Sequence, residues 1–394
     1  MFSMVVGLSL LAVVERALLE GTPVGTPGPA GNDLVLQTPT SPVSRPRPRP
    51  STRPGQSRPP VPSTSTPPDA QALTSQIRRI TLEQRGTVAR RVYGAAPERA
   101  PLVRTDRFSP DRLWAFGTTA IPVPQSSPAP PELAFFAARW TEGRWTAALS
   151  GTAVFANLLS RMPVSMMSPS ESAALARYNF ATASQAAANA ARGTDRLMLP
   201  WSPGTDWTMG SAAPSGEGRP LGALAFWGGD GEVQSAGDGR LYRFCGDGAG
   251  RALVMIVHRS GVSSLYYRMR GVTQLRSGSV VRRGEPLGRT GAERPCGGAP
   301  APRALVQFSL RRGAAEVSMN GAGIGGWRFG ERADPAIGYA ERGDTRVLLG
   351  APLANLGSAL PPLPGQRRPV APGPNEKPKD ATNDNRSPRA NDQQ

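Results

Sequence analysis

Histidine and lysine are almost missing from this chain of 394 residues. A single histidine, His258, excludes every metal or acid–base site that needs two or three imidazoles. All but two of the 46 basic residues are arginine, and the formal net charge is +17. Long apolar runs are also lacking, which excludes a multi-span membrane protein. The 45 glycines and 42 prolines indicate that a good part of the chain is not packed core.

The one apolar run near the N-terminus is Phe2–Val14, within residues 1–20. It is short for a spanning helix and suits the hydrophobic part of a signal peptide. No basic residue precedes it and no clear small-residue cleavage site follows, so a cleaved signal and a retained anchor both stay open. We therefore expect an extracytoplasmic protein, secreted or anchored, that contacts a membrane only through this segment.

Two further segments predict disorder. Residues 21–69 are rich in proline and arginine, a composition that favours an extended linker without a core. Such a linker could hold a domain off a membrane and pass through an anionic wall, or only improve solubility. The tail, residues 346–394, is rich in Pro, Asn, Asp and Gln and is also predicted to be disordered.

Residues 70–195 predict a small α+β domain. Apolar residues recur at helical spacing over 73–92. Strand-type runs follow at 113–123 and 133–149, the second interrupted by a Glu-Gly turn. A capping box then predicts a helix over 168–192. Nothing in this region indicates chemistry, so its aromatic residues are expected to form a core.

Residues 196–345 differ in character, because short β-type runs alternate with glycine-rich turns. This spacing predicts an all-β sheet or sandwich. The predicted strands are 223–227, 232–244, 252–258, 263–269, 279–281 and 304–310.

The motifs of this second region come in a characteristic order. They are Leu199-Pro200-Trp201, Gly231-x-Val233, Val254-x-Ile256-x-His258-x-x-Gly261, Leu265-Tyr266-Tyr267, Gly278-x-Val280-x-x-Gly284, Gly288, Phe308-x-Leu310 and Gly325-Gly326-Trp327. Together they resemble the lysostaphin/LytM-type zinc endopeptidases, most closely the LasA (staphylolysin)-like branch. The resemblance covers about a third of the chain and implies an all-β LytM/lysostaphin-like sheet domain.

The resemblance also implies that the zinc ligands and acid–base histidines of active relatives are replaced in this chain. Its zinc ligands would fall within 211–215, at Ala225 and at Leu305, and its acid–base histidines at Arg268 and Gln307. Catalytic zinc needs about three His, Cys or carboxylate ligands, which these residues do not supply. Arginine stays protonated and cannot shuttle a proton. We therefore expect a catalytically degenerate member with no metal and no cofactor; the alternative is an active metalloendopeptidase with displaced ligands.

The expected function is binding. The resemblance implies a non-catalytic, cell-wall-associated protein that binds peptidoglycan peptides or docks a cell-wall hydrolase. Arg268, Gln307 and Tyr266 are the predicted ligand-binding residues, with Arg268 suited to a carboxylate. Seven arginines and no acid between Arg251 and Gly284 indicate either a solvated face or a site for an anionic wall polymer. Nucleic acid is unlikely because aromatic residues are not interleaved with these arginines.

The remaining reactive side chains are expected to be structural. His258 ends an apolar strand, and no nucleophile elbow accompanies it. Cys245 and Cys296 should form a disulfide if the chain is exported, and the resemblance includes a similar Cys-Gly-Gly segment. Free buried thiols and a Cys/Cys/His metal site remain the alternatives.

Overall fold

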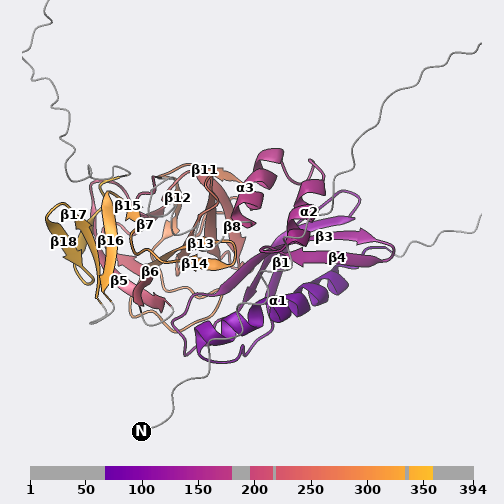
Figure 1. Ribbon diagram of the computed structural model, residues 1–394, viewed down its shortest axis with the longest axis horizontal. Coiled ribbons are helices and arrows are strands. Elements are labelled where there is room, and N and C mark those ends of the chain that lie inside the picture. The colour runs from indigo at the N-terminus through magenta and orange to yellow at the C-terminus, as the bar shows by residue number, and fades with distance from the viewer. Residues whose placement is uncertain (1–66, 180–195, 216–218, 333–336, 358–394) are drawn as a thin grey trace, which may run out of the picture. The chain divides into compact units, whose positions relative to one another are not determined.

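The structure, a computed structural model, describes residues 67–179, 196–215, 219–332 and 337–357 (Figure 1). These residues all belong to one compact unit, Ser63–Gln394. The predicted signal or anchor segment, nearly all of the predicted linker and the helix expected beyond Asn179 lie outside the described residues. Among the described residues, no helix is both long and apolar enough to cross a membrane.

Residues 67–179 form an α+β layer, here called the N-terminal layer. Asp69 caps its first helix by accepting a hydrogen bond from the Gln71 amide, and Gly94 ends that helix at a φ of 71°. Four strands follow as an antiparallel meander in the order β1-β2-β3-β4. The elements are α1 (Ala70–Tyr93), β1 (Leu102–Phe108), β2 (Trp114–Ile121), β3 (Glu132–Thr141), β4 (Arg144–Leu149), α2 (Ala153–Arg161) and α3 (Pro169–Asn179).

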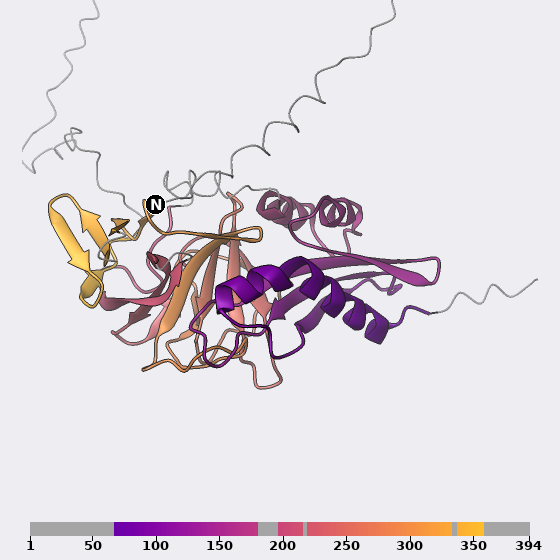
Figure 2. The same ribbon diagram turned by 60° about the horizontal axis from the view of Figure 1, so that its bottom comes forward.

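The four-stranded sheet is covered on both faces, with α1 on one side and α2 and α3 on the other (Figure 2). Successive strand residues point to opposite faces, so Phe135 and Phe136 enter different cores. Phe136 packs with Leu73 and Ile77 of α1. Phe135 packs with Phe155 of α2. The α+β character predicted for this region is therefore present.

Residues 196–357 form the β-rich part, built around a nine-stranded sheet. Eight strands run in the order β11-β8-β9-β10-β13-β6-β5-β19, and β14 pairs with β13. A separate pair, β7 with β12, and a four-stranded sheet, β15 to β18, complete the part. The bounds are β5 (Asp206–Ser215), β6 (Arg219–Trp227), β7 (Glu232–Gln234), β8 (Gly239–Phe244), β9 (Leu253–His258), β10 (Ser263–Tyr267), β11 (Val280–Val281), β12 (Pro286–Arg289), β13 (Val306–Arg312), β14 (Ala315–Val317), β15 (Gly323–Ile324), β16 (Trp327–Arg332), β17 (Ile337–Arg342), β18 (Thr345–Leu348) and β19 (Pro352–Ala354).

The large sheet is buried on both faces at its centre, which explains the uninterrupted apolar run of β9. Val254 and Ile256 face the main core of the β-rich part, where Phe308 also lies. Met255 and Val257 face the other way and share a core with the N-terminal layer. The two parts of the chain are thus joined by a common hydrophobic core.

Two expectations about strands are corrected. Residues 232–244 are not one strand, because residues 235–238 leave the ladder between β7 and β8. The predicted tail also begins too early, since β18 and β19 extend the ordered part beyond residue 345. Leu353 of β19 is fully buried and pairs with Trp207 of β5, so this segment closes the sheet edge instead of remaining disordered.

Candidate functional site

A row of cross-strand partners forms the floor of the candidate site. Gly210 of β5 pairs with Ala225 of β6, Ala225 pairs with Gln307 of β13, and Gln307 pairs with Tyr267 of β10. Directly paired residues point to the same face of a sheet. Ala225 and Gln307, two positions that the resemblance matches to a zinc ligand and an acid–base group, are thus brought together by register although they are far apart in sequence.

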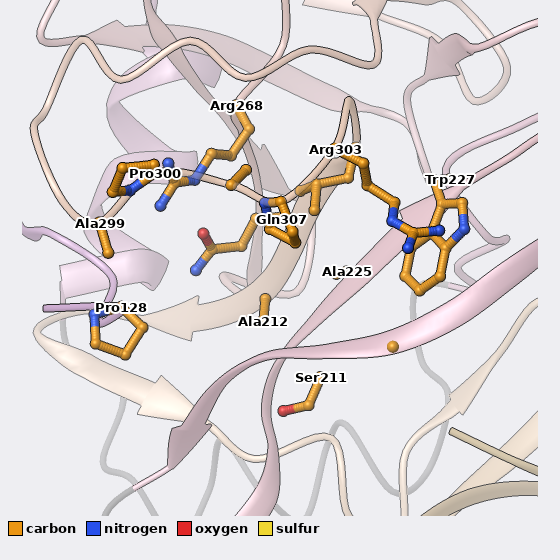
Figure 3. A pocket seen from close by; sticks show the side chains of 14 residues that line it. Pro128, Ser211, Ala212, Ala225, Trp227, Arg268, Ala299, Pro300, Arg303 and Gln307 are labelled. Atoms are coloured by element: carbon orange, nitrogen blue, oxygen red, sulfur yellow. The ribbon is translucent and has the colours of Figure 1, made fainter. Parts of the chain in front are cut away.

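A cavity of about 310 Å³, here called the groove, lies over this row (Figure 3). Its floor faces the same way as the sheet face that the N-terminal layer covers at β8 to β10. The groove is therefore the uncovered remainder of that face. The residues that line it are Pro128, Gly210, Ser211, Ala212, Ala225, Trp227, Arg268, Ala299, Pro300, Ala301, Pro302, Arg303, Leu305 and Gln307.

Arg268 is the most unusual residue of the groove. It directly follows β10 and has a φ of 74°, a left-handed conformation that is costly for a residue with a side chain. Its guanidinium carbon lies 5.2 Å from the centre of the Tyr267 ring, and the residue is only 5% exposed. The Nη1 atom is buried with no hydrogen-bond partner. The structure thus holds a cationic fork in the groove with unused donor capacity.

The electrostatics around Arg268 favour an anion. Burial lowers the pKa of Arg268, and the nearby positive charge of Arg294 lowers it further. Gln307 is 4% exposed, and its amide lies on the same side of the groove as the guanidinium (Figure 3). Among the described residues that line the groove there are two arginines and no carboxylate. A bound anion would balance the positive charge of these two arginines.

The opposite end of the groove is formed by Trp227 and Arg303 (Figure 3). The guanidinium carbon of Arg303 lies 4.8 Å from the centre of the Trp227 ring, a cation–π contact. The sequence alone did not indicate this pair. Trp227 lies two residues beyond Ala225, and Arg303 follows a Pro-Ala-Pro run, so neither belongs to a motif that would have marked it.

The residues at this site do not fit a zinc ion. Ala225 and Leu305 are apolar, and Arg268 would repel a divalent cation. No group of three His, Cys, Asp or Glu side chains that could hold a metal occurs anywhere in the described part of the chain. The groove therefore lacks the donor set that the family resemblance implies for active relatives.

Tyr266 is not a groove residue, which corrects the prediction that it binds a ligand. Its side chain is fully buried on the opposite face of the sheet, with its ring 5.4 Å from that of Phe308. Its hydroxyl accepts hydrogen bonds from the Ala236 amide at 2.7 Å and from Ser264 Oγ at 2.9 Å. Strand alternation decides this outcome, because Tyr267 points to the groove face and Tyr266 cannot.

His258 also lies away from the groove. Its Nδ1 is 2.9 Å from the Asp238 carbonyl oxygen and its Nε2 is 2.8 Å from Ser264 Oγ. The ring is completely buried and belongs to the same polar network as Tyr266. This placement agrees with the structural role expected for it.

The two cysteines form the expected disulfide, with Cα atoms 5.3 Å apart. Cys245 directly follows β8, and Cys296 begins the loop that continues along the groove. Of the seven arginines between Arg251 and Gly284, only Arg268 lines the groove, and the other six are exposed. Most of this charge therefore belongs to a solvated surface.

Comparison with known proteins gives likeness only at the level of solved structures. No protein-family model and no curated protein sequence matches the chain. The M23 metalloprotease pseudoalterin, from the deep sea, is 28% identical, with a TM-score of 0.34 over 40% of this chain and 97% of its own. The lysostaphin catalytic domain from Staphylococcus simulans is 14% identical, with a TM-score of 0.20 over 30% and 78%. The SpoIIIAH–SpoIIQ complex is 14% identical, with a TM-score of 0.22 over 31% and 87%. These neighbours include the M23 and lysostaphin types that the motifs resemble.

Proposed function

We propose that this chain is a non-catalytic, extracytoplasmic protein of the cell wall that binds peptidoglycan peptides in its groove. The observation that carries the proposal is the guanidinium of Arg268, which lines the same groove as Gln307 and meets no carboxylate among the described groove residues. Export or anchoring by residues 1–20 belongs to the same proposal, as does the spacer role of residues 21–69.

The chemistry of the groove suits a peptide that ends in a carboxylate. A carboxylate has two coplanar oxygens, which match the fork of a guanidinium better than a single point charge would. Ala225 has a short side chain, so an extended peptide backbone can approach the sheet there, whereas the Trp227 ring lies against Gly210. Trp227 and Arg303 offer a second contact at the far end. Peptidoglycan stem peptides end in carboxylates, so they meet these requirements.

Titration calorimetry of the whole chain with a synthetic stem tetrapeptide tests this proposal. A charge-assisted contact contributes about 1.5–3 kcal/mol, so Arg268→Ala should weaken binding about 10- to 150-fold. Arg276 is exposed and lies outside the groove, so Arg276→Ala is the matched control and should change the affinity little. The same peptide with a C-terminal amide should bind the unmodified chain as weakly as the free acid binds the Arg268→Ala variant.

Each outcome has a distinct meaning. Equal losses from Arg268→Ala and Arg276→Ala would indicate diffuse attraction of an anionic polymer and would contradict a specific groove. No binding of the tetrapeptide by the unmodified chain would also refute peptide recognition. The docking of a cell-wall hydrolase, through an acidic side chain against Arg268, would then be the function to test.

A further inference from the structure

One wall of the groove comes from the N-terminal layer. The segment that connects β2 to β3, residues 122–131, is here called the β2–β3 connection. Its Pro128 lines the groove, and Ser127 closes a turn by donating a backbone hydrogen bond to the Pro124 carbonyl at 3.1 Å. The site is therefore not built by the β-rich part alone.

The β2–β3 connection is hydrogen-bonded to residues 296–299, here called the glycine loop. The Val123 amide donates to the Cys296 carbonyl at 2.9 Å, and the Gly298 amide donates to the Val123 carbonyl at 3.0 Å. The Ala299 amide donates to the Ser127 carbonyl at 2.8 Å. Val123 and Gly297 form a parallel β-bridge, so the loop is paired to the N-terminal layer as a short strand would be.

The glycine loop in turn covers Arg268. A side-chain carbon at Gly298 would lie 3.6 Å from Arg268 Nη2, so the loop backbone lies directly beside the guanidinium. Tyr267, whose ring lies under the guanidinium, donates its hydroxyl hydrogen to the Gly297 carbonyl at 2.6 Å. These contacts explain why a charged side chain at the rim of a groove is only 5% exposed.

Tyr93, at the end of α1, fixes both ends of the β2–β3 connection. Its hydroxyl donates to the Ile121 carbonyl at 2.7 Å and accepts from the Glu132 amide at 2.8 Å. The side chain is buried with Val123 in a small separate core. A continuous series of contacts therefore runs from α1 through the connection and the glycine loop to Arg268.

We infer that Tyr93 and the β2–β3 connection are positioning elements that hold the glycine loop over Arg268 and limit the solvent exposure of its guanidinium. The N-terminal layer thus supports the anion site through the glycine loop and is not an independent domain beside it. The effect on ligand affinity rests on the proposed function, whereas the effect on the exposure of Arg268 does not.

The test measures how fast Arg268 of the full chain reacts with phenylglyoxal, an arginine-selective reagent, mapped by peptide mass spectrometry. In Gly297→Ala the added carbon would collide with the Val123 carbonyl and force the loop away. Gly204 has a similar φ, +83° against +85° for Gly297, and nothing within 4 Å of the added carbon, so Gly204→Ala controls for backbone strain alone. Tyr93→Phe removes the hydroxyl that bonds the Ile121 carbonyl and the Glu132 amide, and Tyr93 does not line the groove.

Gly297→Ala and Tyr93→Phe should each speed the reaction at Arg268 by about tenfold. This is the effect expected when the glycine loop loses about one hydrogen bond's worth of stability in its closed position. Both should also weaken tetrapeptide binding, and Gly204→Ala should change neither quantity. Unchanged reactivity of Arg268 in both folded variants would overturn the inference. Faster reaction without any peptide binding by the unmodified chain would keep the inference and refute the proposed function instead.

Discussion

Arg268→Met should make the protein slightly more stable while it weakens peptide binding. A buried donor without a partner costs about 1–3 kcal/mol, and Arg268 Nη1 is such a donor. The cation–π contact with Tyr267 is buried, so it stabilises the protein by about 2 kcal/mol, which the substitution forfeits. Methionine has a similar length and keeps the packing of the arginine stem. The strain of the positive φ is the same in both proteins and cancels.

The cost of the unpartnered donor lies at the upper end of its range because the group is charged, so the expected gain in the free energy of unfolding is about 1 kcal/mol. Urea unfolding followed by tryptophan fluorescence measures it, and an unchanged slope against urea would show that both proteins expose the same surface on unfolding. A residue that binds a ligand can lower the stability of the unliganded protein, because binding sites trade stability for function.

Arg311 provides a contrasting case in the same protein, because its Nε lacks a partner but both of its Nη atoms are hydrogen-bonded. It is 1% exposed, but it donates to Glu132 Oε2 at 3.2 Å and to the Pro131 and Ala314 carbonyls at 2.9 Å. Arg311→Met leaves the buried Glu132 carboxylate without this partner and should cost about 3–5 kcal/mol. A loss of 1 kcal/mol or more in Arg268→Met would show that Arg268 is structural, and the reasoning about the groove would fail.

Three further predictions follow from other sites. Non-reducing alkylation should leave Cys245 and Cys296 unlabelled, and replacing both by serine should lower stability by about 2–4 kcal/mol; two labelled thiols in freshly purified protein would contradict the disulfide. Burial raises the pKa of Glu316, so the folded chain holds this proton more tightly than the unfolded chain, and stability falls as pH rises through the raised pKa. Glu316→Gln should remove that fall, which unfolding curves at pH 4 and pH 8 would show as a gain at pH 8 alone. Metal analysis of the purified protein should find less than one zinc per chain, because the groove offers no ligand set, and chelator-sensitive cleavage of peptidoglycan would disprove this.

Local patterns in the sequence predicted local structure well. Helical spacing identified α1, and the capping glycine follows it at Gly94. The Glu-Gly pair predicted the β3–β4 turn, where both residues have positive φ. Strand boundaries were less reliable: residues 345–354 are mostly apolar, which is compatible with strands, but their composition does not say that Leu353 is buried against β5. That burial depends on an edge of the sheet formed by residues far away in the sequence.

What the sequence by itself determined is the chemistry that is missing. The chain has one histidine, so it cannot form a site that needs two imidazole ligands, and the resemblance places Ala225, Leu305 and Arg268 where active relatives carry catalytic groups. Which residues remain to bind a ligand was decided only by the tertiary structure. Strand register places Gln307 beside Ala225, and strand alternation turns the Tyr266 side chain to the opposite face of the sheet, away from the groove. Packing of the N-terminal layer buries Arg268 under a loop held by distant backbone groups, and backbone hydrogen bonds of this kind leave no mark in the amino-acid sequence.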